Sequence, residues 1–228
     1  MQSNQILSEE LLERCAQRAA GYDRENRFFF EDFDELREAK YPLVAVPEEF
    51  GGRGLTLLEL CREQRRLARR SAPTALGINM HLLATGTAAD LWRRGDESQV
   101  WILEEAARGA VFAQGYSESG NDLEALYSSS KAERVDGGYR FFGRKHFGTL
   151  SPVWTWLNLS GADTADSGGP KIVHAVMPRD TTGYRIEDVW DTLGMPPART
   201  RSSKVRSCRT GMSSAREGPA LRAPTSLF

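Results

Sequence analysis

Hydrophobic residues in the first half of the chain recur at the three- and four-residue spacing of amphipathic helices. The first predicted helix places its apolar face on Ile6, Leu7, Leu11, Leu12, Cys15, Ala16 and Ala19. Gly21 suits the C-terminal stop of this helix, and a short helix is expected over 33–40. Thr56 and Glu59 form a capping box, T-x-x-E, in front of the next apolar series, so a third helix is expected there.

The segment 71–94 is small and apolar, as in a helix packed inside a bundle. Asp96 and Gln99 offer a cap-like start for a last helix, which ends at Gly109. The first 109 residues are therefore predicted to form an all-helical domain.

After Gly109 the spacing between apolar residues shortens toward the two-residue alternation of strands. Asp136, Gly137 and Gly138 are typical of a hairpin turn between two such runs. Strands are expected at 111–114, 127–135, 139–145, 153–159, 171–177 and 184–190. We therefore predict an α+β chain in which the helical bundle is followed, over 110–195, by an incomplete antiparallel β-barrel or sandwich domain.

Residues 196–228 differ in composition from the rest. They carry a net charge of +6, whereas the preceding 195 residues carry −7, and they contain few large apolar residues. A basic segment for nucleic acid is one interpretation, but a disordered, irregular basic tail is the one we adopt. We expect no nucleic-acid partner.

Composition also limits the class of protein. The chain is 40% hydrophobic and 27% charged, no apolar run approaches the ~20 residues that cross a bilayer, and the N-terminus lacks a secretory pattern. We expect no membrane partner and a cytoplasmic location. The three cysteines and three histidines have no metal-ligand spacing, so no metal is predicted. Gly51, Gly52 and Gly54 are interpreted as a turn between helices rather than a phosphate loop, because no Gly-Lys-Ser/Thr follows.

Two segments carry the candidate chemistry. FAQGYSESGND (112–122) begins as an apolar strand and ends in small polar residues, and KHFGT (145–149) places an aromatic ring two residues from a hydroxyl. We interpret the two together as holding an isoalloxazine ring. The alternatives are an ordinary polar turn at 117–122 and an ordinary core aromatic at Phe147. Glu118 and Asp122 are four residues apart, but nothing indicates an acid/base pair.

Five segments occur in the order seen in acyl-CoA dehydrogenases. They are VPEEFGGRGL (46–55), GDESQ (95–99), YSESGND (116–122), DGGYRFFGRKHFGT (136–149) and WDTLGM (190–195). Over residues 5–195 the chain resembles the N-terminal helical domain and the middle β-domain of that family. The resemblance implies an FAD cofactor, a small-molecule acyl thioester substrate oxidised at its Cα–Cβ bond, an electron acceptor, and a homo-oligomer that we do not extend to this chain.

The resemblance also implies site residues. Ser117 stands where the family has a threonine that bonds the flavin, and Asn121 stands in a serine position near the pyrophosphate; both are also substrate-binding candidates. Phe147 would pack on the flavin face, and the Thr149 hydroxyl would reach the reactive ring nitrogen. Gln114, Tyr116 and Gly148 complete the cofactor-binding candidates.

The chain departs from the family pattern in this site. Ser119 replaces a proline, two residues are missing before Asn121, and Phe147 replaces a tryptophan. These changes leave room for a flavin-dependent monooxygenase of the same fold. A non-catalytic, degenerate fragment is the third hypothesis.

The resemblance stops near Met195. In the family, a C-terminal four-helix bundle carries the catalytic base, and we expect that bundle to be absent here, so no catalytic residue is named. We hypothesise that the Arg/Pro/Ser-rich tail is translated in a shifted reading frame, which sequencing the gene would test. The chain alone is expected to bind flavin weakly or not at all and to lack dehydrogenase turnover.

Overall fold

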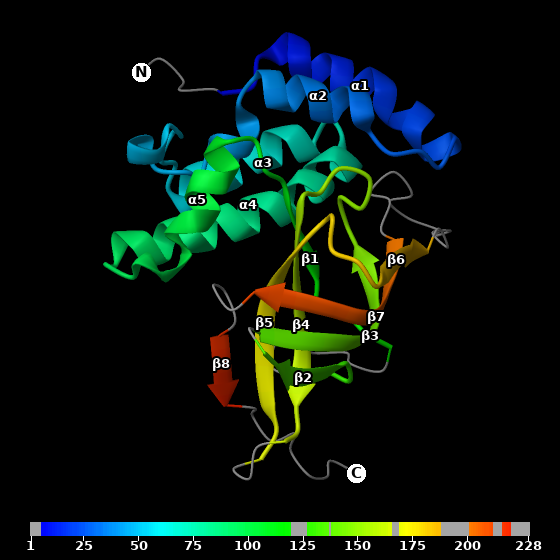
Figure 1. The fold of residues 1–228 in the computed structure, drawn as a ribbon. Helices are drawn as coiled ribbons and strands as arrows, with labels where there is room; N and C mark the ends of the chain where they lie inside the picture. Colours follow the sequence, from blue (N-terminus) through cyan, green and yellow to red (C-terminus); the bar gives the residue numbers. More distant parts are fainter. Residues whose placement is uncertain are drawn as a thin grey trace, which may run out of the picture. The chain divides into compact units, whose positions relative to one another are not determined.

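The computed structural model describes residues 6–119, 127–136, 138–165 and 169–187, together with the backbone of 201–211 and 216–219. The chain divides into two units (Figure 1). The first, here called the helical unit, contains residues 1–113, 149–154 and 190–200; the second, here called the β-unit, contains residues 114–148, 155–189 and 201–228. Their bounds show that the chain passes from one unit to the other more than once.

Helices make up the first unit, as predicted. They are α1 (Glu9–Arg24), α2 (Phe30–Glu38), α3 (Leu57–Ala68), α4 (Ala72–Arg93) and α5 (Val100–Ala107), with short 3-10 helices η1 (Tyr41–Leu43), η2 (Glu48–Phe50) and η3 (Glu97–Gln99). No helix among the described residues is long and apolar enough to cross a membrane.

Helix α4 is the centre of this unit, and α1, α2, α3 and α5 all contact it. Its small residues allow close approach: a Cβ on Gly77 would lie 2.2 Å from the Cζ atom of Phe29. Ile78, Leu82 and Ala88 are fully or almost fully buried. A helix that is apolar on most of its surface is expected to be surrounded by others, as α4 is.

Two helix starts have the capping residues that the sequence predicted, and one helix end differs from its prediction. The Thr56–Glu59 capping box is present at the start of α3, and the Asp96 side chain accepts a hydrogen bond from the Ser98 N–H at η3. The predicted stop of the first helix at Gly21 is wrong, because α1 continues to Arg24. The next turn buries Tyr22 completely, and its hydroxyl bonds to Asp32, so packing extends the helix past the glycine.

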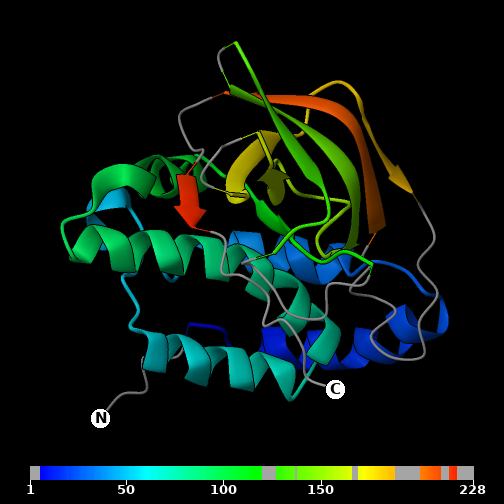
Figure 2. The ribbon, with the colours of Figure 1, turned by 90° about the horizontal axis from the view of Figure 1, so that it is seen from below.

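The β-unit contains one sheet with the strand order β6-β7-β3-β2-β4-β5-β8, and β1 pairs with β4 (Figures 1 and 2). The strands are β1 (Phe112–Gly115), β2 (Lys131–Val135), β3 (Gly138–Gly148), β4 (Trp156–Asp163), β5 (Lys171–Pro178), β6 (Tyr184–Glu187), β7 (Arg201–Gly211) and β8 (Arg216–Pro219).

Most pairs in this sheet are antiparallel. The predicted hairpin is present, because β2 and β3 pair with Val135 opposite Gly138. Strands β4 and β5 pair along their full length, and β2 meets β4 in parallel at Lys131 and Ala162. The sheet is therefore mixed rather than purely antiparallel.

Strands β7 and β8 lie in the segment expected to be irregular. The backbone of β7 pairs with β3 and β6, and that of β8 pairs with β5. Ladder hydrogen bonds use main-chain groups, so an available sheet edge can accept a strand whose own side-chain pattern is weak. This difference could not be read from composition.

Candidate functional site

The first candidate segment begins at the end of β1. Gly115 lies so close to β4 that a Cβ there would be 3.2 Å from the Leu157 Cδ1 atom. Gln114 before it is half-buried. The Tyr116 ring meets the His174 ring edge to face with centroids 5.7 Å apart, and burial raises the pKa of the Tyr116 hydroxyl to about 12. Close packing thus anchors this segment where it leaves the strand.

The second candidate segment is the end of β3. Phe147 is 58% exposed and has a φ of 57°, in the left-handed region that non-glycine residues avoid at a cost of about 1–2 kcal/mol. The backbone pairing of β3 with β7 also shifts register between Lys145 and Gly148, as at a β-bulge. Phe147 is therefore not a core aromatic but an exposed ring on a locally strained backbone.

The two segments lie side by side. The His146 N–H donates to the Ser117 carbonyl oxygen at 2.8 Å, and the Ser119 Oγ lies 3.5 Å from the His146 Nε2. Ser117 and Ser119 are exposed, whereas Glu118 between them is buried. The structure thus brings Ser117 and Phe147 onto adjoining segments, as the sequence analysis expected of a shared site.

Between these segments lies a buried ion pair. The Lys145 ammonium donates to the Glu118 carboxylate, and the side chains are 4% and 1% exposed. The ammonium also lies 3.3 Å from the Ser128 Oγ and 3.5 Å from the Ser160 Oγ. An ammonium has three donors, so each finds an acceptor here.

Three consecutive serines surround the carboxylate. Ser128 donates to Glu118 Oε1 at 2.8 Å, and the Ser129 N–H and hydroxyl donate to Oε2 at 2.5 and 2.8 Å. The Ser130 N–H donates to Oε1 at 3.2 Å, and its hydroxyl also donates there. Ser130 has room because position 143 on β3 is glycine: a Cβ on Gly143 would lie 1.9 Å from the Ser130 Oγ.

The electrostatics of the pair follow from this enclosure. Burial alone would raise the pKa of Glu118, but the hydrogen bonds from Lys145 and Ser130 and the lysine charge outweigh it, and the pKa falls to about 2. Burial lowers the pKa of Lys145, and its contact with Glu118 opposes that shift. Burial and the Lys145 charge also lower the pKa of His174. At neutral pH Glu118 is an ionised, fully hydrogen-bonded carboxylate.

The sequence analysis did not find this cluster. It considered Glu118 only beside Asp122, and it quoted Lys145 within KHFGT without giving it a role. The signals present in the sequence were the three serines at 128–130 and a lysine two residues before Phe147. Neither signal identifies its partner, because 27 residues separate Glu118 from Lys145.

The remaining candidates are distributed as follows. Gly148 is buried at the end of β3 in the β-unit, whereas Thr149 is buried and belongs to the helical unit. Asn121 and Asp122 lie outside the described residues. No group of three metal-ligating side chains occurs among the residues that the structure describes.

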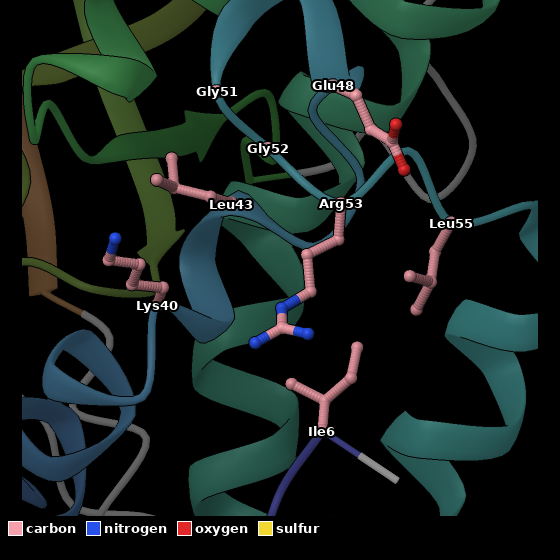
Figure 3. Close-up of a pocket in the computed structure, with 8 residues that line it drawn as sticks. All are labelled: Ile6, Lys40, Leu43, Glu48, Gly51, Gly52, Arg53 and Leu55. Carbon is pink, nitrogen blue, oxygen red and sulfur yellow. The ribbon is translucent and has the colours of Figure 1, made fainter. Parts of the chain in front are cut away.

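A separate cavity of about 450 Å³ lies in the helical unit (Figure 3). Ile6, Lys40, Leu43, Glu48, Gly51, Gly52, Arg53 and Leu55 line it. The N–H groups of Gly51, Gly52 and Gly54 donate to the carbonyl oxygens of Glu48, Pro47 and Val46. Because the loop uses these amides internally, they do not form a phosphate cradle, and the interpretation of this loop as a turn is confirmed.

Comparison with known proteins gives this geometry a context. Residues 6–111 match the family model of the acyl-CoA dehydrogenase N-terminal domain. The chain is 29% identical over 182 residues to the putative acyl-CoA dehydrogenase YdbM of Bacillus subtilis, covering 78% of this chain and 47% of that protein. It is 27% identical over 188 residues to the probable FMNH2-dependent monooxygenase SfnC of Pseudomonas putida, covering 82% of this chain and 45% of that protein.

A solved structure is similar in both domains. The structure of KijD3 in complex with FMN and dTDP-3-amino-2,3,6-trideoxy-4-keto-3-methyl-D-glucose is 28% identical, with a TM-score of 0.81 over 94% of this chain and 53% of that one. A helical domain followed by a β-domain with this fold defines a class of flavoenzyme-like proteins. Over residues 6–111 the chain is similar to the acyl-CoA dehydrogenase N-terminal domain, and it spans about half the length of the relatives that it matches.

Proposed function

We propose that the β-unit supplies one wall of a flavin site in a flavin-dependent oxidoreductase. The observation that carries this proposal is Phe147, an exposed aromatic ring on a strained bulge beside the exposed Ser117. Strained backbone and exposed aromatic surface are both costly without a ligand, and both concentrate at functional sites.

The described residues fit an isoalloxazine ring. Phe147 offers a flat apolar face for stacking, and Ser117 offers an exposed hydroxyl for a polar ring edge. The buried Glu118 and Lys145 neutralise each other, and Ser117 and Phe147 are accessible beside them. A bound flavin would supply electron-transfer chemistry that no side chain supplies. The proposal includes both FAD, which the family resemblance implies, and FMN.

The first candidate reaction is oxidation of the Cα–Cβ bond of an acyl thioester with FAD. It is supported by the match to the acyl-CoA dehydrogenase N-terminal domain and by the similarity to YdbM. Under this candidate, Ser117 and Asn121 would contact substrate as well as cofactor.

The second candidate is a monooxygenase that uses reduced FMN. It is supported by the similarity to SfnC and to the FMN complex of KijD3, and by the departures from the dehydrogenase motif at Ser119 and Phe147. Because the chain spans about half of these relatives, either activity is proposed for the β-unit as a contributor to a site.

Flavin binding is the first test. The purified chain would be titrated into FMN and into FAD while flavin fluorescence is recorded, with Phe147→Ala as the variant. Loss of a stacking ring should weaken binding by about 3- to 10-fold. Tyr127→Ala is a matched control, since Tyr127 is 51% exposed in the same unit and belongs to no candidate site. Equal affinities for the wild type and Phe147→Ala would contradict the proposal.

The reaction is the second test. Dye reduction with an acyl-CoA would support the dehydrogenase, and oxygen consumption with reduced FMN would support the monooxygenase. A chain that binds flavin and does neither would support the non-catalytic hypothesis.

A further inference from the structure

The Glu118–Lys145 ion pair occupies a particular place relative to the proposed flavin wall. Each residue of the pair is close in sequence to an exposed candidate residue. Glu118 directly follows Ser117, and Lys145 precedes Phe147 by two positions. The side chains of the ion pair are buried, whereas those of Ser117 and Phe147 are exposed. Any movement of the pair would be transmitted to both exposed residues through short lengths of backbone.

Two independent contacts join these segments. One is the main-chain hydrogen bond from the His146 N–H to the Ser117 carbonyl, and the other is the ion pair itself. The first is a local contact of 2.8 Å, and the second is embedded among the serines at 128–130 and Ser160. The ion pair thus connects the bulge to β4 and to the segment that leads into β2.

The completeness of the hydrogen bonding argues for a specific role. A buried ion pair gives less stability than a well-packed apolar pair of the same size, because both charges lose their hydration. An ion pair provides a defined geometry when all its hydrogen-bond donors and acceptors are satisfied. Here that geometry adjoins a residue with a positive φ, which needs surrounding contacts to hold it.

We propose that Glu118 and Lys145 are positioning residues, which hold the His146–Phe147 bulge against the Ser117 segment so that the aromatic ring and the hydroxyl keep one spacing. The pair does not contact the flavin in this role; it acts through Ser117 and Phe147. The inference rests on the proposed function, but its main consequence, the closed His146–Ser117 contact, exists without any ligand.

The test uses three variants of the full chain. Lys145→Met leaves a buried, unpaired carboxylate. The double variant Glu118→Gln/Lys145→Met removes both charges. Arg144→Met is the matched control, because it removes the neighbouring ion pair from Arg144 to Glu187, 2.8 Å long and with the Arg144 side chain 48% exposed, on the same strand.

Hydrogen exchange of the His146 amide is the ligand-independent readout, with the amides of the β4–β5 pair as the internal reference. We expect exchange at His146 to accelerate at least about 10-fold relative to that reference in both Lys145→Met and the double variant, and to stay unchanged in Arg144→Met. Normal relative protection of His146 in the double variant would overturn the proposal, since the pair would then be a structural feature only.

Flavin affinity is the second readout. We expect the double variant to bind FMN or FAD at least about 10-fold more weakly than the wild type even where its folded β4–β5 core is protected. Unchanged affinity would overturn the positioning role. If the wild-type chain binds neither flavin, the proposed function fails, and the His146 exchange rates alone still decide whether the pair holds the bulge.

Discussion

The helical unit and the β-unit each enclose a carboxylate, and the surroundings of the two differ. Asp32 on α2 is fully buried and accepts hydrogen bonds from Arg18 at 2.7 Å, Tyr22 at 3.0 Å and Thr74 at 2.6 Å. These donors come from α1 and α4, so the carboxylate joins three helices. The cation is 24% exposed, so water reaches it.

The cation of Glu118 is enclosed more completely than that of Asp32, because the Lys145 side chain is only 4% exposed. The donors to Glu118 come from the serines at 128–130 and from β3, the strand that also carries the exposed Phe147. Asp32 also has an exposed ring two positions away, because Phe30 is 47% exposed, but Phe30 lies in α2 and has no positive φ. The comparison shows that a buried carboxylate is not by itself a sign of function. What distinguishes Glu118 is that the exposed ring two residues beyond its partner, Phe147, has a positive φ.

The largest expected difference concerns removal of each cation. Lys145→Met should lower the free energy of unfolding by about 3–5 kcal/mol, because Glu118 would remain buried without its counter-charge. Arg18→Met should cost about 1–2 kcal/mol, since Asp32 keeps two hydroxyl donors. Urea unfolding curves of both variants would measure this. Equal decreases in the free energy of unfolding of the two variants would contradict this difference.

Acid should affect the His81 site and the Glu118 cluster in different pH ranges. In the helical unit, His81 is fully buried, its Nε2–H donates to the Pro42 carbonyl at 3.1 Å, and its Nδ1 accepts from the Phe112 N–H at 3.2 Å. Burial lowers the pKa of His81 from 6.5 to about 4. The unfolded chain therefore binds the proton first, and stability should fall by about 3 kcal/mol as pH drops from 6.5 to 4.

In the β-unit the Glu118 cluster should respond at lower pH, whereas His174, whose pKa is also lowered by burial, should reduce stability below pH 6.5 as His81 does. The pKa of Glu118 is lowered from 4.5 to about 2, so its stabilising contribution is lost as pH falls from 4.5 toward 2. Hydrogen exchange followed against pH would resolve the two units. His81→Gln should remove the dependence of the helical unit above pH 4.5 and leave the lower range of the Glu118 cluster unchanged. In a His174→Gln variant, loss of β-unit protection already at pH 6 would contradict this assignment.

A smaller effect is expected from Gly143→Ala. The added Cβ would lie 1.9 Å from the Ser130 Oγ, so the serine must leave its position beside Glu118, at a cost of about 1–3 kcal/mol. Chemical unfolding measures the cost, and a neutral result would show that the serine cluster adapts easily.

The smallest effect is of opposite sign. Gly21 lies inside α1 without a positive φ, and a Cβ added to it would meet no atom within 4 Å. Gly21→Ala should therefore stabilise the chain by about 0.5–1 kcal/mol through helix propensity. A thermal melt would detect the gain, and a loss would mean that the helix end needs the glycine.

Local patterns predicted most of the elements. The capping box at Thr56, the apolar helix 71–94 and the hairpin at Asp136 depend on residues close in sequence, and each is present. The stop at Gly21 failed because Tyr22 packs against a distant element. The strands after residue 200 were not expected because sheet pairing depends on the edge that receives them.

For the candidate site, the sequence predicted the two segments, their order along the chain and their resemblance to acyl-CoA dehydrogenases. It could not determine that Phe147 is exposed at a positive φ, or that Glu118 and Lys145 meet inside a ring of serines. Those properties depend on tertiary contacts across 27 residues, where burial decides both the charge state and the direction of each side chain. The motifs therefore predicted which segments carry the candidate residues, and the fold determined which of their side chains are exposed and which are buried.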